Sequence, residues 1–321
     1  MIPLRDDIPA RATPVVTHVL IAVNVAVFFV QASQGPHLDR FIYIYGLVPA
    51  RYFVPQIADY FSTGQQLFAL LSFMFLHGGI WHLLGNMWSL YIFGDNVEDR
   101  LGPLRYAAFY LLSGLLSGLA HLLIYRTSNI PTIGASGAIA GVMGAYFLLF
   151  PRARVLTLVP LLFIPLFFHI PAAFYLGLWF LLQFWNAAGS GAVGGIAWWA
   201  HIGGFLAGMG LIHAFEHLPA AGIANPPRRT TERLQFILPA EGGEDPHVRG
   251  TVTVSAHEAR VGARKLVGVR QGFYEKILRV QVPPGVRDGL VLRLPGLGRR
   301  APDGAAGDLL LTVVVSEHPT H

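Results

Sequence analysis

The chain has 321 residues, of which 53% are hydrophobic and 13% are charged, whereas an average soluble domain is roughly 25% charged. Residues 1–217 hold 17 of the 41 Asp, Glu, Lys and Arg side chains, and residues 218–321 hold the other 24. This asymmetry excludes a single soluble globule and predicts a membrane domain followed by a polar domain. The net charge of +5 predicts no nucleic-acid partner, and the absence of cysteine excludes disulfides, thiol catalysis and cysteine-ligated zinc.

Six apolar segments are counted as transmembrane spans with a window of about 20 residues. They fall near residues 15–32, 79–95, 105–124, 135–150, 170–186 and 200–216. The first is also compatible with a signal peptide, because Val30-Gln-Ala32 resembles a cleavage site, but its leader is not basic and further spans follow. The stretch 157–168 contains Pro160 and Pro165 and is expected to be an interfacial excursion rather than part of the fifth span.

The arginines between the spans predict the orientation of the chain in the membrane. One set of loops carries Arg100, Arg105, Arg152, Arg154, Arg228 and Arg229, whereas the alternate loops carry Arg40, Arg51 and Arg126. We therefore predict a multi-pass protein of the bacterial inner (plasma) membrane with both termini in the cytoplasm. In this topology the second, fourth and sixth spans all run from the outer face to the inner face.

Polar side chains occur early in each of these three codirectional spans. His82 and Asn86 lie on one face of the second span because of their i, i+4 spacing. Ser136 opens the fourth span within Gly134-Ala-Ser-Gly-Ala138, and His201 opens the sixth within Ala200-His-Ile-Gly-Gly204. Polar groups at membrane depth cost free energy and are usually functional. The four side chains are therefore expected to converge near one level below the outer face.

Ser136 and His201 suit acyl transfer, with the hydroxyl as nucleophile and the imidazole as base. No Asp or Glu occurs between Asp99 and Glu216, so a dyad is predicted rather than a triad with an orienting carboxylate. The backbone N–H of Ser136 and the side chains of His82 and Asn86 are the predicted donors to the oxyanion. No metal is expected, because His257-Glu258 lacks the second histidine of a zinc-protease helix.

Glycines are expected to bring the fourth and sixth spans together. Gly204 and Gly208 form a small-xxx-small pair in the sixth span. The fourth span carries its own row at Gly134, Gly137, Gly141 and Gly144. Close backbone approach would bring Ser136 within reach of His201. Four glycines at 189, 191, 194 and 195 predict a mobile gate before the sixth span.

Over roughly residues 10–217 the chain resembles the rhomboid intramembrane serine proteases. The resemblance rests on His77-Gly-Gly-Ile-Trp-His-Leu-Leu-Gly-Asn86, on the Ser136 and His201 motifs, and on Glu98-Asp-Arg100. It implies an all-α polytopic bundle of six transmembrane helices and a serine endopeptidase that cleaves transmembrane segments of other proteins without a cofactor. By the same resemblance Ser136 is the nucleophile, His201 its base, and His82 and Asn86 the oxyanion-stabilising pair; His77 matches a frequent family histidine.

A linker rich in Pro, Gly and Ala is predicted at 218–247, followed by a small all-β domain at 248–321. Short alternating runs mark its strands at 251–255, 276–282, 290–294 and 309–315. The stretch Val282–Arg300 and the closing run from Gly307 to Pro319 resemble the C-terminal substrate-binding β-domain of DnaJ-type co-chaperones. The chain lacks that family's His-Pro-Asp tripeptide and its cysteine zinc module. The resemblance therefore implies binding of unfolded or extended polypeptide, or a stabilising or oligomerising role, but no stimulation of Hsp70.

The predicted partners are transmembrane protein substrates and the lipid bilayer, with extended polypeptide at the C-terminal domain. Two alternatives remain open. A catalytically inactive escort would bind membrane proteins for quality control without cutting them, although it would not need a nucleophile. A six-span transporter would call for ionisable residues along a central path, whereas spans three to six contain no acidic residue before Glu216.

Overall fold

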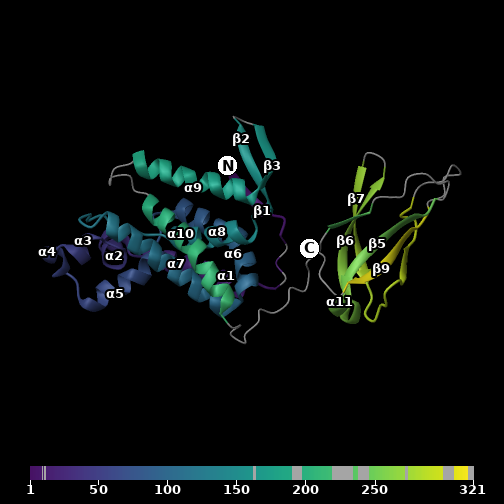
Figure 1. Cartoon of the computed structure of the whole chain (residues 1–321), viewed down its shortest axis with the longest axis horizontal. Helices are drawn as coiled ribbons and strands as arrows, with labels where there is room; N and C mark the ends of the chain where they lie inside the picture. The colour runs from purple at the N-terminus through teal and green to yellow at the C-terminus, as the bar shows by residue number, and fades with distance from the viewer. Residues whose placement is uncertain are drawn as a thin grey trace. The chain divides into compact units, whose positions relative to one another are not determined.

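The computed structural model of the chain describes residues 1–8, 10, 12–161, 164–189, 197–218, 234–237, 246–271, 274–298 and 307–316. The chain divides into two compact units, Met1–Arg228 and Arg229–His321. Figure 1 follows the chain through both, from the helices of the first unit to the strands of the second. The predicted linker at 218–247 lies largely outside the described residues.

Six helices of the first unit occupy the segments where spans are predicted. They are α1 (Val15–Ala32), α6 (Ile80–Leu101), α7 (Pro103–Ile124), α8 (Ser136–Leu149), α9 (Ala172–Gly189) and α10 (Trp198–His217). By length and composition, two of the described helices, α1 and α7, are able to cross a membrane, or three if the pair Thr63–Phe75 and Ile80–Leu101, bent by 77°, is one span. Helix α8 is apolar but has only 14 residues.

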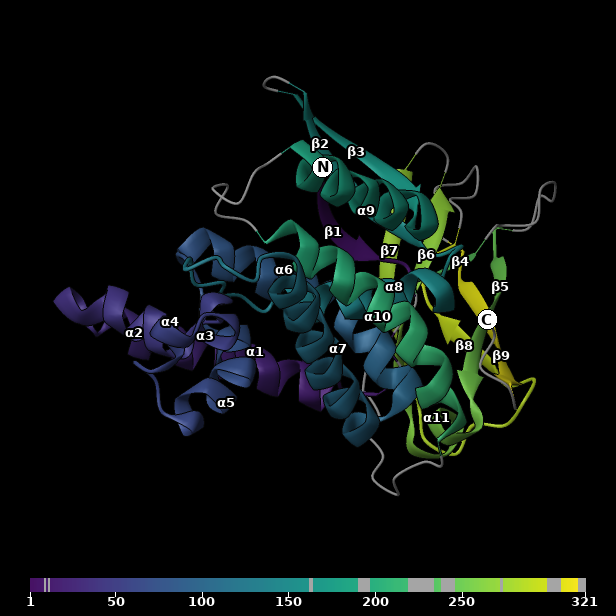
Figure 2. The same cartoon turned by 60° about the vertical axis from the view of Figure 1, so that its left-hand side comes forward.

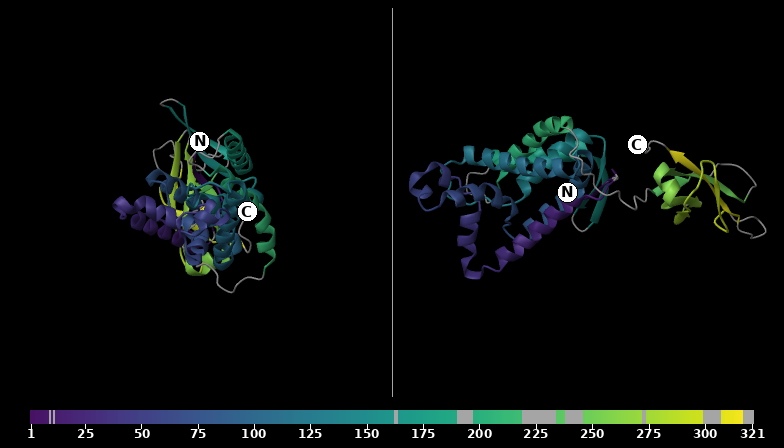
Figure 3. Two further views of the ribbon diagram at one scale, coloured as in Figure 1. Left: turned by 90° about the vertical axis from the view of Figure 1, so that its left-hand side faces the viewer. Right: turned by 90° about the horizontal axis from the view of Figure 1, so that it is seen from below.

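Four short helices between α1 and α6 were not predicted. They are α2 (Leu38–Tyr45), α3 (Ala50–Phe53), α4 (Pro55–Ala58) and α5 (Thr63–Ser72), with 3-10 turns at Gly35–His37 and Phe73–Phe75. Buried Arg51 holds this segment together, because its guanidinium lies 3.7 Å from the centre of the Phe61 ring and donates to the carbonyl of Ile44 at 3.0 Å. Figure 3 shows these helices at the end of the unit away from β2 and β3.

The backbones of α8 and α10 touch along the predicted glycine row. A Cβ added at Gly204 would lie 2.0 Å from the carbonyl oxygen of Gly137, and one added at Gly208 would lie 1.9 Å from that of Gly141. Only glycine permits this separation, since a side-chain carbon would overlap the facing backbone. Figure 2 shows α8 and α10 beside each other, next to α7. The prediction that glycines bring these two helices together is confirmed.

Helix α1 is capped by a side chain from another helix. Its own N-terminus at Pro14 offers no side-chain cap. The buried Glu98 carboxylate on α6 instead accepts from the backbone N–H groups of Val16 and Thr17, at 2.9 and 2.8 Å, and from the Thr17 hydroxyl. A negative charge at this position also complements the partial positive charge of a helix N-terminus. The Glu98-Asp-Arg100 segment at the end of α6 therefore holds the N-terminus of α1 through the Glu98 carboxylate.

Three strands form a small sheet in the helical unit, so the expectation of an all-α unit is corrected. Strand β1 (Ile2–Asp6) pairs antiparallel with β2 (Arg154–Leu161), and β2 pairs antiparallel with β3 (Ile164–Pro171). The stretch expected to be an interfacial excursion is therefore a hairpin. Its alternation of aromatic, aliphatic and β-branched residues suits strands, and its two prolines, Pro160 and Pro165, face each other in register. The pairing with β1 is a long-range contact that local sequence does not reveal.

The described residues of the C-terminal unit form two three-stranded sheets. One has the order β4 (Leu234–Ile237), β6 (Ala263–Gln271), β7 (Tyr274–Val282), and the other has the order β5 (Val248–Ser255), β9 (Leu309–Ser316), β8 (Val291–Leu294). The four predicted strands correspond to β5, β7, β8 and β9. Strand β4 lies inside the predicted linker and pairs parallel with β6. A one-and-a-half-turn helix, α11 (Ala256–Val261), begins at a capping box formed by Ser255 and Glu258.

Candidate active site

Ser136 is the first residue of α8, and backbone hydrogen bonds fix the segment that precedes it. Gly134 donates its backbone N–H to the carbonyl of Phe73 at 2.9 Å, and Thr132 pairs with Leu47 in an isolated bridge. Gly134 has φ +134°, and a Cβ there would lie 2.8 Å from the His82 ring. The first-turn N–H groups of a helix have no carbonyl partners within it, so the backbone at Ser136 offers donors beside its hydroxyl.

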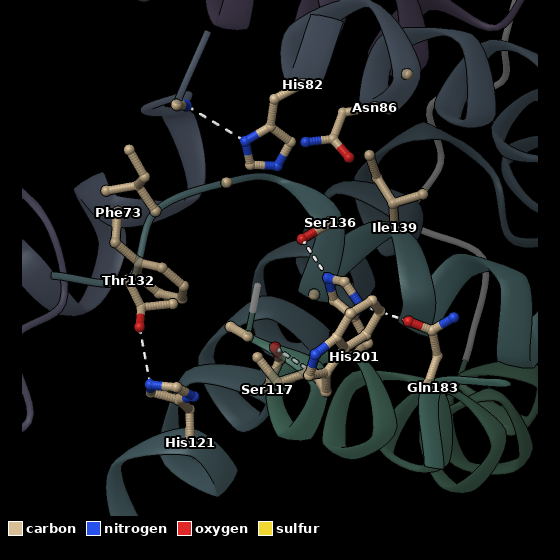
Figure 4. A pocket seen from close by; sticks show the side chains of 18 of the residues that line it. Phe73, His82, Asn86, Ser117, His121, Thr132, Ser136, Ile139, Gln183 and His201 are labelled. Carbon is tan, nitrogen blue, oxygen red and sulfur yellow. Dashed lines mark hydrogen bonds between the residues drawn. The ribbon is translucent and has the colours of Figure 1, made fainter. Parts of the chain in front are cut away.

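The structure brings Ser136 and His201 into direct contact. Ser136 Oγ and His201 Nε2 are 2.8 Å apart, within hydrogen-bonding distance. Both side chains are half-buried, and Figure 4 shows the imidazole directed at the hydroxyl from the first turn of α10. The distance follows from the glycine contacts between α8 and α10, because Gly204 lies one turn from His201.

The other imidazole nitrogen of His201 is bonded to Gln183, which sequence reasoning missed. His201 Nδ1 lies 2.9 Å from Gln183 Oε1 on α9. Gln183 is only 5% exposed, and its amide nitrogen donates to the carbonyl of Trp179 at 2.9 Å. A glutamine inside a largely apolar helix was the available signal, since a buried amide needs hydrogen-bond partners. The sequence-based expectation of a dyad rested on the absence of a carboxylate in the later spans.

His82 and Asn86 lie on the other side of Ser136, as Figure 4 shows. His82 is exposed, and its Nδ1 accepts from the backbone N–H of Gly78 at 3.3 Å. Asn86 is 8% exposed, and its amide nitrogen Nδ2 is buried without a hydrogen-bond partner among the described residues. A buried donor without a partner is costly to a folded protein, so Asn86 is suited to bind an acceptor that enters the site.

His77 is fully buried behind this group. Its backbone N–H donates to Gln31 Oε1 at 3.0 Å, and its carbonyl accepts from Gln31 Nε2 at 2.6 Å. The His77 ring lies edge-on to the His82 ring, with their centres 5.2 Å apart. His77 therefore fixes the chain that leads into α6 against α1 and supports the position of His82.

The four predicted residues line one cavity of about 820 Å³. The same cavity is lined by His121, whose Nε2 is 2.8 Å from the hydroxyl of Thr132, two residues before Gly134. Ser117 donates to the carbonyl of Ala200 at 2.7 Å and ties α7 to the start of α10. The cavity is large enough for a segment of polypeptide and has donors at one point of its wall.

Two further expectations concern the surroundings of this cavity. Among the residues that the structure describes, no group of three or more His, Cys, Asp or Glu side chains could hold a metal ion. Three of the four glycines expected to form a gate, at 191, 194 and 195, lie outside the described residues.

The fold and the site together define a helical membrane protein with a serine–histidine pair facing a cavity. Residues 64–216 match the Rhomboid domain, and residues 248–321 match the DnaJ C terminal domain. Over residues 64–216 this chain is therefore similar to the rhomboid family, whose members are embedded in membranes. Both resemblances inferred from the sequence motifs are confirmed.

Several curated relatives are rhomboid proteins. The chain is 30% identical to Rhomboid protein 1, mitochondrial, from Saccharomyces cerevisiae over 198 residues, which are 60% of this chain and 51% of that protein. It is 41% identical to RHOMBOID-like protein 5 from Arabidopsis thaliana over 76 residues, 24% of this chain and 25% of that protein. It is 37% identical to Inactive RHOMBOID-like protein 8 from the same plant over 84 residues, 26% of this chain and 23% of that protein. The chain thus spans about half the length or less of these relatives, and one of them is named inactive.

Proposed function

We propose that this protein is an intramembrane serine endopeptidase that cleaves transmembrane segments of other membrane proteins. The observation that carries the proposal is the 2.8 Å contact between Ser136 Oγ and His201 Nε2. This contact is what a base needs in order to take the proton of a serine hydroxyl. The match of residues 64–216 to the Rhomboid domain supports this interpretation of the pair.

The reaction is acyl transfer in two steps. Ser136 Oγ attacks the scissile carbonyl carbon while its proton passes to His201 Nε2. His201 then gives that proton to the amide nitrogen, the C–N bond breaks, and the amine fragment leaves an ester on Ser136. In the second step a water molecule loses a proton to His201 and attacks the ester carbonyl. The ester bond to Ser136 Oγ breaks, the acid leaves, and His201 returns the proton to Ser136 Oγ. No cofactor takes part in this scheme.

The negative charge on the carbonyl oxygen needs donors that are already in position. Asn86 Nδ2 is a buried donor without a partner among the described residues, and the backbone N–H of Ser136 lies at a helix N-terminus. His82 borders the same cavity. In this proposal the three groups bind the oxyanion, and each is expected to contribute about 2.7–4 kcal/mol to transition-state stabilisation.

We place the protein in the bacterial inner membrane with six crossings and both termini in the cytoplasm. The six helices at the predicted spans and the arginine distribution between them support this topology. Ser136, His82 and His201 all lie in the first turns of α8, α6 and α10. In this topology the cavity lies toward the outer face, and substrates are cut near that face.

We further propose that the C-terminal unit binds extended polypeptide. The match to the DnaJ C terminal domain over 248–321 supports this role. Among the described strands, β5 and β8 are at the edges of their sheet, and an extended peptide is able to add to such an edge. This role is tested by measuring how much denatured protein is captured by the full chain and by a form ending at Arg228. The full chain should capture more, and equal capture by both forms would contradict the proposal.

Replacing Ser136 by Ala tests the endopeptidase directly. Cleavage of a single-span substrate in proteoliposomes is expected to fall by about 10⁶-fold, because the nucleophile is lost. A fluorophosphonate should label Ser136 in the parent chain, and His201→Ala should abolish that labelling. Ser33→Ala is the control, because the Ser33 hydroxyl is exposed and bonded to the carbonyl of Val30.

The alternative is an inactive escort. One relative of the chain is named inactive, which favours testing this alternative. An escort would bind the same single-span protein without cutting it, and Ser136→Ala would leave that binding unchanged. Absence of both cleavage and Ser136 labelling, in protein shown to be folded in bilayers, would overturn the endopeptidase in favour of the escort.

A further inference from the structure

Gln183 stands directly behind the serine–histidine pair. The imidazole of His201 lies between two partners, with Ser136 Oγ 2.8 Å from Nε2 and Gln183 Oε1 2.9 Å from Nδ1. Figure 4 shows this row of three side chains, which come from three different helices. Gln183 is only 5% exposed, so water has little access to replace its hydrogen bond to His201.

The second hydrogen bond of Gln183 determines which end of its amide faces His201. The amide nitrogen donates to the carbonyl of Trp179 at 2.9 Å, one turn earlier on α9. Turning the amide over would place its oxygen against that carbonyl oxygen, and two acceptors repel each other. The oxygen therefore faces the imidazole, and it can only accept a hydrogen bond.

An acceptor at Nδ1 selects one form of the neutral imidazole. The proton must reside on Nδ1, where it is donated to Gln183, and Nε2 is left with a lone pair. A lone pair on Nε2 is what His201 needs in order to accept the proton of Ser136. The opposite tautomer would present an N–H to the serine hydroxyl, and its lone pair on Nδ1 would face away from Ser136.

Other described groups near the ring do not serve this purpose. Trp179 and Trp198 flank His201 with ring centres 6.0 Å away, and an indole nitrogen only donates. No carboxylate occurs between Asp99 and Glu216. A neutral amide also avoids the cost of burying a second charge in this part of the bundle.

We propose that Gln183 is the positioning residue of the dyad, which holds His201 in the Nδ1–H tautomer and directs its Nε2 at Ser136. The inference rests on the proposed endopeptidase, because it assigns Gln183 the part that an aspartate plays in serine proteases with a triad. It predicts that Gln183 affects the chemical step and leaves substrate binding unchanged.

Three variants test this role in proteoliposomes with a single-span substrate. Gln183→Leu is expected to lower kcat by about 100-fold with KM unchanged, because the base is present but wrongly oriented. Gln183→Glu keeps an acceptor oxygen at the same place and should recover at least about 10-fold of that loss. Asn186→Leu is the matched control, since Asn186 lies one turn further on α9, donates to the carbonyl of Leu182, and is outside the cavity lining. It should retain the parental kcat.

The tautomer is measured independently of activity by ¹⁵N nuclear magnetic resonance of lipid-embedded protein labelled at histidine. The His201 signals are those lost in His201→Ala. In the parent chain Nδ1 should be protonated and Nε2 bare, and Gln183→Leu should populate the opposite form. Unchanged kcat in Gln183→Leu, or an unchanged tautomer despite lower kcat, would overturn the inference. Failure of the parent chain to cleave or to be labelled at Ser136 overturns the endopeptidase instead, and the tautomer comparison still decides the role of Gln183.

Discussion

The helical unit and the C-terminal unit are stabilised by different kinds of contact. In the helical unit, α8 and α10 touch backbone to backbone at glycines, and large side chains such as Trp81 and Trp185 are 82% and 80% exposed. In the C-terminal unit, alternating valines and leucines of both sheets form a separate apolar core. The first arrangement suits a solvent of lipid, where small residues let helices approach closely. The second depends on the hydrophobic effect in water.

The difference determines how each unit responds to substitution. At the glycine contacts an added carbon has no space, so the helices must move apart and the serine–histidine distance changes. In the β-sheet core a removed carbon leaves a cavity, and the cost is limited to the stability of that unit. Function and packing are therefore closely linked in the helical unit and separable in the C-terminal one.

Among the substitutions that compare the two units, Gly208→Ala should have the largest effect. Its Cβ would lie 1.9 Å from the Gly141 carbonyl oxygen, so α10 must shift and carry His201 with it. A displacement of about 1 Å is able to cost 10²-fold in rate, and we expect a loss of that order in Ser136 labelling together with a lower Tm. Gly210→Ala on the same helix is the control, because nothing lies within 4 Å of its Cβ. Equal labelling of the two variants would show that the glycine contacts do not set the site.

Leu311→Ala should destabilise the C-terminal unit alone. Leu311 is fully buried on β9, paired with Gly250 and Leu292, and a buried Leu→Ala change typically costs about 2–5 kcal/mol. Hydrogen exchange of β9 peptides in the full chain should accelerate, whereas Ser136 labelling should stay at the parental level. Val314→Ala, on the same strand but 38% exposed, should change exchange little. A parallel loss of Ser136 labelling in Leu311→Ala would mean that the units are coupled.

The smallest effect concerns pH and Asp6 on β1. Asp6 Oδ2 accepts from the Tyr146 hydroxyl at 2.5 Å and from Asn96 Nδ2 at 2.9 Å. Burial raises the pKa of Asp6 from 3.8 to about 7; the Tyr146 hydrogen bond opposes this rise, and Asp95 and Asp7 add to it. The folded state thus binds this proton more tightly than the unfolded state does. Its contribution to stability is complete below pH 3.8 and is lost as the pH rises through about 7.

Tm measured at pH 5 and pH 8 tests this linkage. The parent chain should lose stability at the higher pH, and Asp6→Asn should lose less because its side chain does not titrate. Asp59→Asn, at an exposed position of the helical unit, is expected to keep the parental difference. An equal fall of Tm in Asp6→Asn and the parent chain would contradict the assignment.

The sequence by itself predicted much of the helical arrangement and the central pair of the site. Apolar segments of the sequence located the six helices α1, α6, α7, α8, α9 and α10. This was possible because composition over about 20 residues is a local property. Ser136, His201, His82 and Asn86 were found because each interrupts such a segment near its start. The small-residue spacing at Gly204 and Gly208 was enough to predict the close contact between α8 and α10.

Only the tertiary structure decided the features that depend on distant segments. Gln183 acquires its partner 18 residues away across a helix interface, and β1 pairs with β2 across about 150 residues of chain. Strand β6 was missed because its charged residues interrupt the alternation, and α11 because its capping box at Ser255 and Glu258 spans barely one turn. Periodicity reports which residues face a core, but it does not report which buried amide, carboxylate or strand edge will find which partner. Those choices are made when the chain packs, because a buried polar group is stable only beside a partner that folding brings to it.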